Sequence, residues 1–315
     1  MPSTFETELT GRVLVVRFDN PPHNFMDRVM VAELDELLDS LEGDRSVGSV
    51  VLTGKPEGVF ITHYDVEEIL AGAEGVGRTL SAGVAGASLQ TVGTVARLPG
   101  ARAALERMPV SGVLELHRIH EVFLRMQRTD KVFVAAINGP ALGGGCEIVL
   151  ACDLRYMAAS ARWIGLPEMT LGFCPGAGGT QRLSRMLGPS RALELILEGR
   201  PLSPDRAQEV GLVHRVVADD ELVAEAGSTA ERLARRAPYS VAAAKRAVLE
   251  AATKPLPEGL AEERKWFMSA VSQPAARRAM RAYAERVGSS GAPWASDEEL
   301  AVWQEGTAVD LVADA

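Results

Sequence analysis

The stretch Asn138–Glu147 reads Asn-Gly-Pro-Ala-Leu-Gly-Gly-Gly-Cys-Glu, and it directly follows the apolar run 132–137. That run is rich in β-branched and aromatic residues, which is typical of a buried strand. Three consecutive glycines let the backbone approach another group closely, and we expect a helix to begin near Gly144. The first N–H groups of a helix lack partners within it and carry the positive end of its dipole. The stretch therefore predicts either a tight strand-to-helix turn or an anion site such as an oxyanion hole.

Two glutamates close turn-forming segments in this part of the chain. Glu147 ends the glycine stretch, and Glu168 ends the segment Gly165–Glu168, which reads Gly-Leu-Pro-Glu. A second glycine-rich segment, residues 175–183, follows shortly after. An acid in the first turn of a helix also simply favours the helix dipole, so Glu147 alone is weak evidence. Together, two carboxylates and a loop of backbone donors are what proton-transfer catalysis requires.

Strands and helices alternate on both sides of these segments. Apolar and β-branched runs predict strands at residues 13–18, 48–54, 132–137 and 153–157. Apolar residues at helical spacing predict helices at residues 31–41 and 113–128. This alternation indicates an α/β layered core.

Residues 71–112 interrupt that alternation, because they hold eight glycines among small apolar residues. A structureless loop of this length is rare unless it is a lid or is mobile. Two interpretations stay open: a poorly ordered surface insertion, or an adaptable wall of a ligand pocket.

Beyond about residue 200 the sequence becomes helical. Ser203 and Pro204 form a good helix start, and further helices are predicted at 221–236, 239–252 and 258–287. Residues 288–315 accumulate acids and contain no Lys or Arg. We expect this tail to be partly ordered at most, with Trp294 and Trp303 as the side chains that could dock it.

Composition limits the function classes. The net charge of −9 argues against a nucleic-acid or anionic-membrane surface, and the three cysteines have no metal-ligand spacing. The N-terminus resembles no signal or transit peptide, and no apolar run is long enough for a membrane span. We expect a cytoplasmic protein with no nucleic-acid or membrane partner.

Taken in order, these segments resemble the crotonase (enoyl-CoA hydratase/isomerase) family. Residues 138–147 look like its oxyanion-loop signature, and 165–168 with 175–183 look like its second signature. The stretch from Val51 to Asp65 resembles its first oxyanion loop. The resemblance implies a crotonase-like spiral of β-β-α units at residues 1–200 with the insertion 71–112. It also implies a C-terminal helical trimerisation region at 201–287, the acidic tail lying outside the pattern, and a homotrimer or hexamer.

The resemblance also implies a site for an acyl-CoA thioester. The backbone N–H groups of Tyr64 and Gly144 match the oxyanion hole, and both catalytic glutamates of the family's hydratases match Glu147 and Glu168. We assign Glu147 to the water and Glu168 to the C2 proton. The remaining substrate-binding positions predicted are Thr62, His63, Asp65, Gly143, Pro167 and Gly176. Coenzyme A is part of the substrate, and no metal or other cofactor is expected.

The chain departs from the family pattern in its first oxyanion loop. His63 stands where the family usually has glycine, and bulky Tyr64 stands where it has a small residue. Histidine adopts a positive φ only uncommonly, so the sequence leaves open whether this half of the oxyanion hole keeps its geometry. We expect the Tyr64 side chain to narrow the acyl pocket. The interval between Asp153 and Glu168 is one residue longer than usual, so we expect a turn or bulge at residues 158–162.

With both glutamates present, the resemblance implies an enoyl-CoA hydratase, a hydro-lyase that adds water in syn fashion across the 2,3 double bond of a 2-enoyl-CoA to give 3-hydroxyacyl-CoA. Other functions stay open at this point. A double-bond isomerase or a CoA-ester hydrolase of the same family is one alternative, and a non-catalytic acyl-CoA-binding protein is another. For the phosphates of CoA, the candidates are basic residues of the last predicted helix. They are Arg277, Arg278, Arg281 and Arg286. A solvated helix face explains these arginines at least as well.

Overall fold

The computed structural model describes residues 3–77, 79–96, 105, 111–290 and 296–313. Its main sheet has six strands in the order β1-β2-β3-β4-β6-β8, and every pair is parallel except β1 with β2. The strands are β1 (Phe5–Thr10), β2 (Val13–Phe18), β3 (Ser49–Gly54), β4 (Val132–Ile137), β6 (Leu154–Ala158) and β8 (Arg215–Val217). The predicted α/β class is confirmed.

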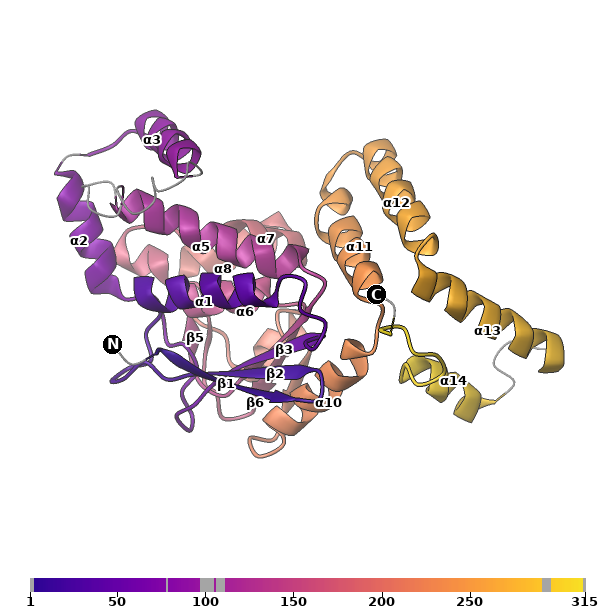
Figure 1. Ribbon diagram of the computed structural model, residues 1–315. Coiled ribbons are helices and arrows are strands. Elements are labelled where there is room, and N and C mark those ends of the chain that lie inside the picture. Colours follow the sequence, from indigo (N-terminus) through magenta and orange to yellow (C-terminus); the bar gives the residue numbers. More distant parts are fainter. Residues whose placement is uncertain (1–2, 78, 97–104, 106–110, 291–295, 314–315) are drawn as a thin grey trace.

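Helices cover both faces of this sheet. The described helices of the core are α1 (Arg28–Leu41), α2 (Val66–Val76), α3 (Ala82–Val95), α5 (Ser111–Arg128), α6 (Gly144–Ala151), α7 (Gly179–Leu187), α8 (Pro189–Glu198), α9 (Pro204–Glu209) and α10 (Leu222–Ala234). In Figure 1, α1 and α5 lie above the sheet and α10 lies below it, where it contacts β2, β3, β4 and β6. The central strands β3 and β4 are buried along their whole length because both of their faces are covered.

A second, two-stranded sheet brings the two glutamate segments together. It consists of β5 (Ala141–Leu142) and β7 (Ile164–Gly165), which pair in parallel with Leu142 opposite Gly165. Strand β5 leads into α6, which carries Glu147, and β7 leads into the short 3₁₀ helix η1 (Glu168–Leu171). Segments that lie about twenty residues apart in the sequence are therefore adjacent in space.

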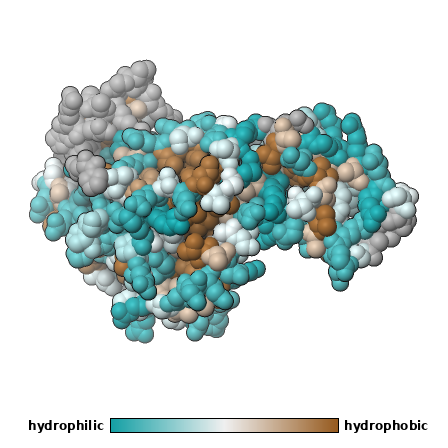
Figure 2. Space-filling model, turned by 60° about the horizontal axis from the view of Figure 1, so that its bottom comes forward, coloured by the Kyte–Doolittle hydropathy of each residue, from teal (hydrophilic) through white to brown (hydrophobic). Residues whose placement is uncertain are grey.

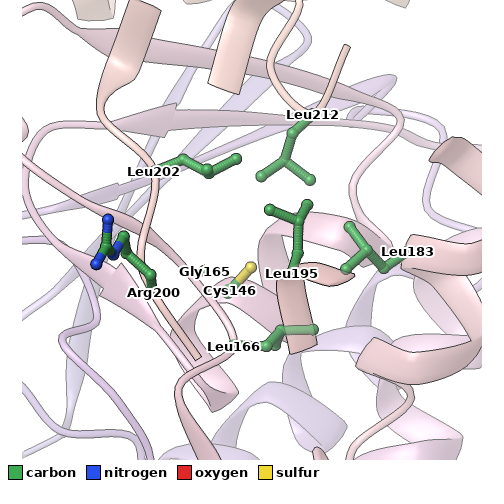
Figure 3. A pocket seen from close by; sticks show the side chains of 8 residues that line it. All are labelled: Cys146, Gly165, Leu166, Leu183, Leu195, Arg200, Leu202 and Leu212. Carbon is green, nitrogen blue, oxygen red and sulfur yellow. The ribbon is translucent and has the colours of Figure 1, made fainter. Parts of the chain in front are cut away.

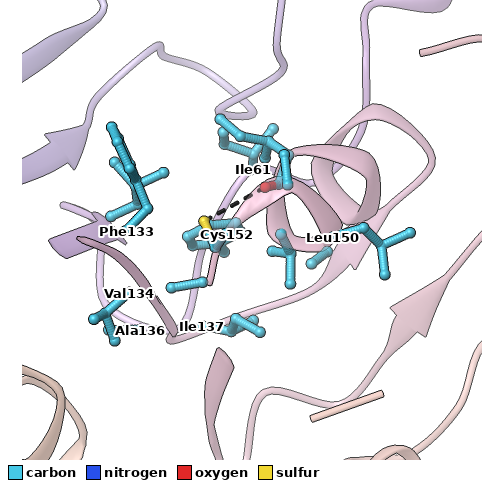
Figure 4. Packing of buried hydrophobic residues seen from close by; sticks show 14 of the residues in the cluster. Ile61, Phe133, Val134, Ala136, Ile137, Leu150 and Cys152 are labelled. Atoms are coloured by element: carbon cyan, nitrogen blue, oxygen red, sulfur yellow. Dashed lines mark hydrogen bonds between the residues drawn. The ribbon is translucent and has the colours of Figure 1, made fainter. Parts of the chain in front are cut away.

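Helix α6 is fixed in the core, where it packs against β5, α5 and α7. Figure 4 shows Leu150 and Cys152, at the end of this helix, beside β4 residues such as Phe133 and Ile137. The Cys152 thiol donates to the carbonyl of Ile148 at 3.5 Å. Every residue of α6 is buried, so the helix has no freedom to tilt without opening the core.

The C-terminal helices lie to one side of the core in Figure 1. They are α11 (Pro238–Leu249), the 3₁₀ helix η2 (Ala251–Thr253), α12 (Leu256–Val271), α13 (Pro274–Ser290) and α14 (Asp297–Gln304). The single helix predicted at 258–287 is wrong. Pro274 lacks the N–H needed to continue a helix from α12, so it begins α13 instead.

The tail is more regular than predicted in its described part. Ser296 caps α14, and the Trp303 ring meets Tyr283 of α13 edge-to-face with centroids 5.6 Å apart. Arg286 pairs with Glu299 at 2.6 Å, which ties the same two helices together. The predicted docking of Trp303 is confirmed, whereas Trp294 lies outside the described residues.

The described part of the insertion is mostly helical. Helix α3 packs on α5, and Val92, Leu105 and Leu114 form a small cluster of their own beside the main core. Residues 78, 97–104 and 106–110 lie outside the described part. The turn expected at 158–162 is confirmed, because Arg162 adopts a left-handed φ of 64° there.

Candidate active site

Gly143 turns the chain from β5 into α6. It has φ 49° and ψ −121°, a conformation that side chains rarely adopt. Its N–H donates to the carbonyl of Gly165 at 2.9 Å, and its own carbonyl accepts the N–H of Glu147 at 2.9 Å. A Cβ at this position would stand 3.2 Å from Oε1 of Glu168. The glycine is therefore required both by the turn and by the carboxylate beside it.

The backbone of Tyr64 lies close to Gly144, the first residue of α6. A Cβ built on Gly144 would stand 3.3 Å from the Tyr64 nitrogen and 3.0 Å from Tyr64 Cβ. The Tyr64 loop is held in place because Met26 donates to the His63 carbonyl at 2.9 Å and Leu142 donates to the Thr62 carbonyl at 2.9 Å. Within the described residues, neither the Tyr64 nor the Gly144 N–H donates to a protein acceptor. Such a pair of free donors suits a developing oxyanion.

Glu147 is buried and held by backbone donors. Its side chain is only 3% exposed, and Oε1 accepts the N–H groups of Ala177 at 2.8 Å and of Gly179 at 2.7 Å. Burial raises the pKa of Glu147, while those two hydrogen bonds and the nearby Arg182 act against the rise. Both backbone donors use one oxygen, so the second oxygen of the carboxylate can face a ligand.

Glu168 is buried in a different environment. Its side chain is 8% exposed, and among the described residues Oε2 has no hydrogen-bond partner. Burial, and after it the negative charge of Glu147, raise the pKa of Glu168 to about 7. Two neighbouring carboxyl groups thus differ in their donors, which is the arrangement that separates an acid from a base.

The other predicted positions fall into two groups. Gly143 contacts the site directly, Pro167 precedes Glu168 as the residue before η1, and Gly176 lies in the loop that holds Glu147. Thr62 and Asp65 have local partners instead: the Thr62 hydroxyl donates to the His23 carbonyl, and the Asp65 carboxylate caps α2 through the Glu67 N–H.

His63 has a negative φ, so replacing the family's glycine does not produce a left-handed backbone at this position. Among the described residues, Asn24 and Arg162 are the non-glycine residues with positive φ. The Asn24 side chain donates to the Phe60 carbonyl, and the His63 ring stacks on Phe25 with centroids 4.1 Å apart. The strained residue therefore lies in the neighbouring loop, and the first oxyanion loop keeps an ordinary backbone.

Several residues that surround the glutamates were not predicted from the sequence. The N–H groups of Ala177 and Gly179 hold Glu147, and Arg182 donates to the Ala177 carbonyl at 3.1 Å. His120 of α5 contacts the Gly176 carbonyl at 2.6 Å. The segment 175–183 stands out in the sequence for its glycines. Nothing in its spacing indicates that its N–H groups bind the carboxylate of Glu147, thirty residues before Ala177.

A small apolar cavity lies beside the site (Figure 3). Its lining residues are Cys146, Gly165, Leu166, Leu183, Leu195, Arg200, Leu202 and Leu212. With a volume of about 10 Å³ it is at the lower limit for a single water, so it is too small for an acyl group. Burial raises the pKa of the Cys146 thiol well above its usual value, which makes it a packing residue and a poor nucleophile.

No group of three or more His, Cys, Asp or Glu side chains in the described part of the chain is placed to hold a metal ion. None of its helices combines the length and the apolar character of a membrane span.

Comparison with known proteins identifies the class. The family model for enoyl-CoA hydratase/isomerase matches residues 8–90 and 106–291. The chain belongs to this family, and the predicted resemblance and fold are confirmed.

Individual relatives point the same way. A short-chain-enoyl-CoA hydratase of Clostridium acetobutylicum is 32% identical over 280 residues, which cover 89% of this chain and 94% of the relative. A 2,3-dehydroadipyl-CoA hydratase of Escherichia coli is 43% identical over 147 residues, covering 47% of this chain and 57% of the relative. The crystal structure of an enoyl-CoA hydratase from Bacillus anthracis superposes with a TM-score of 0.71 at 29% identity, covering 90% of this chain and 96% of that one. The prediction of an enzyme of the hydro-lyase type agrees with these relatives.

Proposed function

We propose that this protein hydrates 2-enoyl-CoA thioesters to 3-hydroxyacyl-CoA. The observation that carries the proposal is the pair of buried carboxyl groups, Glu147 and Glu168, in unlike environments next to two free backbone donors. Relatives named enoyl-CoA hydratases over most of the chain support the same reaction.

The oxyanion hole would act first. The thioester oxygen accepts from the N–H groups of Tyr64 and Gly144, which stabilises the negative charge that develops as C3 is attacked. Removing one such donor typically costs on the order of 3 kcal/mol. The donors are pre-positioned because the Tyr64 loop and α6 are fixed by backbone hydrogen bonds.

The two glutamates would divide the proton transfers. Glu147, held by Ala177 and Gly179, orients a water and accepts one of its protons while the water oxygen bonds to C3. Glu168, whose raised pKa favours the protonated form, gives its proton to C2. The two carboxyl groups then exchange a proton with each other or with solvent, which restores the starting state.

This chemistry uses no metal and no redox cofactor, since polarisation comes from backbone donors and the protons from carboxyl groups. Coenzyme A enters as part of the substrate. For its phosphates we keep the arginines of α13 as candidates, with one refinement. Arg278 donates to the Asp310 carbonyl and Arg286 pairs with Glu299, so Arg277 and Arg281 are the better candidates.

We further propose a homotrimer, alone or paired into a hexamer. Figure 2 shows hydrophobic surface on the C-terminal helices as well as on the core. Phe267 and Met268 of α12 are at least 60% exposed, and so is Leu171 in the same short helix as Glu168. Leu193 and Leu197 of α8 are close to that value. Two unlike apolar surfaces of this kind support head-to-tail contacts that close into a ring. A cytoplasmic location is supported by the three free cysteines.

Loss of the conjugated enoyl absorbance on mixing with crotonyl-CoA tests the proposed reaction, with the product identified as 3-hydroxybutyryl-CoA. A double-bond isomerase would leave crotonyl-CoA unhydrated and would convert a 3-enoyl-CoA instead. A CoA-ester hydrolase would release free thiol. If the protein hydrates no crotonyl-CoA throughout the range from pH 5 to pH 9, the proposal is contradicted.

A further inference from the structure

Tyr64 offers two different groups to the site. Its backbone N–H is one of the two free donors, and its side chain starts beside Gly144, where a Cβ would lie 3.0 Å from Tyr64 Cβ. The backbone nitrogen and the ring-bearing Cβ are both bonded to the Tyr64 Cα. A thioester held by the Tyr64 N–H therefore lies within reach of the Tyr64 ring. The ring is half-buried and packs against the main core.

The ring is fixed at its far end. The phenol of Tyr64 donates to Oε2 of Glu68 at 3.1 Å. Glu68 in turn accepts the Arg28 N–H at 3.0 Å, and its other oxygen lies 3.4 Å from Nε of Arg28. Glu68 belongs to α2 and Arg28 to α1, so two helices hold the ring in one orientation. Burial, and after it the charges of Glu68 and Glu115, raise the pKa of the phenol, which keeps it a neutral donor.

Helix α5 borders the same region. Leu116 lies 3.9 Å from a Cβ built on Gly176, and His120 contacts the Gly176 carbonyl, so this face of α5 abuts the loop that holds Glu147. One residue before Leu116, the Glu115 carboxylate pairs with Arg118 at 3.3 Å. An acyl chain passing the glutamates would thus meet a ring that is held in place, which blocks its path, and a charged pair beside which burying methylenes is unfavourable.

We propose that the Tyr64 side chain, anchored by Glu68, is the wall that restricts this enzyme to short acyl groups. The proposal rests on the proposed function for its substrate class, but it concerns acyl length alone. Each methylene that finds an apolar site strengthens binding about fourfold. Behind the wall, methylenes beyond the first few should add nothing.

The test compares the binding of butyryl-CoA and decanoyl-CoA, which carry no double bond and need no catalysis. In the wild type, decanoyl-CoA should bind no more than about fourfold tighter than butyryl-CoA, the gain of a single methylene. Tyr64→Ala should raise the ratio of the two affinities at least about tenfold, because a few methylenes gain room. Tyr64→Phe removes the bond to Glu68 and keeps the bulk, so its ratio should stay within about threefold of the wild type. Hydration of the four-carbon and ten-carbon 2-enoyl-CoA should shift in the same sense.

Each outcome decides something. A wild type whose affinity climbs through decanoyl-CoA at about fourfold per methylene overturns the wall, whether or not Tyr64→Ala folds. An unchanged ratio in a folded Tyr64→Ala overturns it too. If Tyr64→Ala raises the ratio of the two affinities but the wild type hydrates no 2-enoyl-CoA, the wall is upheld and the proposed reaction is overturned. Normal hydration with an unchanged ratio upholds the reaction and overturns the wall.

Discussion

The surroundings of Glu147 and of Glu168 differ, although both groups are buried and lie near each other. Glu147 stands in the first turn of α6 and receives two backbone hydrogen bonds on one oxygen. Glu168 begins the 3₁₀ helix η1, and its Oε2 has no partner among the described residues. Hydrogen bonds to a carboxylate favour the charged form, whereas burial without them favours the neutral form. The two environments therefore suit opposite proposed roles, a base at Glu147 and an acid at Glu168.

We expect the largest loss of turnover when one backbone donor of the proposed oxyanion hole is removed. Gly144→Pro deletes one N–H of the oxyanion pair, and proline is tolerated at the first position of a helix. Turnover should fall below detection while circular dichroism and oligomeric state stay unchanged. Gly144→Ala is the matched control: it brings the same close approach to Tyr64 but keeps the N–H, so measurable turnover should survive. Equal activity of the two variants would mean that the carbonyl is held elsewhere.

Removing the acid should have the next largest effect. Glu168→Gln preserves the shape but cannot give a proton, so the hydration kcat should fall by at least ~100-fold, the low end for acid–base catalysis. Binding of butyryl-CoA should stay within a few-fold of the wild type, which separates chemistry from binding. Near-normal turnover in the folded variant would refute the role of Glu168.

Replacing the base should separate hydration from isomerisation. Glu147→Gln keeps an acceptor for Ala177 and Gly179 but loses the base, so hydration should drop ~100-fold. Isomerisation of a 3-enoyl-CoA should drop far less, since Glu168 alone can carry one proton between C2 and C4. Glu147→Ala also leaves the two amides without their acceptor, so it should lower stability as well. Hydration that survives either change would contradict the two-carboxylate account.

The smallest expected effect is on stability, and its sign follows from the raised pKa. Glu168 titrates near 7 in the folded protein and near 4.5 when unfolded. As pH rises from about 4.5 to 7 the unfolded chain loses this proton first, so stability falls across that window and then levels off. Glu168→Gln should therefore be more stable than the wild type at pH 8, by up to roughly 3 kcal/mol, and by little at pH 4.5. Urea denaturation at the two pH values checks this. A Glu168→Gln variant that is less stable than the wild type at pH 8 would show that ionised Glu168 does not destabilise the folded protein.

Local sequence signals predicted most of the fold and the positions of both glutamates, but not the difference between their surroundings. The strand 132–137 and the cap at Ser203–Pro204 were predicted correctly, because β-branched runs and capping residues act over a few residues. The single helix at 258–287 was wrong because Pro274 outweighed a continuous apolar pattern. Both glutamates were found from their motifs. Their different partners were not, since Ala177 reaches Glu147 only through tertiary packing.

The pH dependence of hydration tests the central claim most directly, because it reports the protonation of the acid itself. The claim is that Glu168 must be protonated and Glu147 ionised in the active enzyme. With crotonyl-CoA, kcat/KM of the wild type should fall about tenfold per pH unit above a pKa near 7. In Glu168→Gln the residual activity should lose that decline. A wild-type profile that stays flat to pH 9, or an identical decline in the variant, would contradict the account.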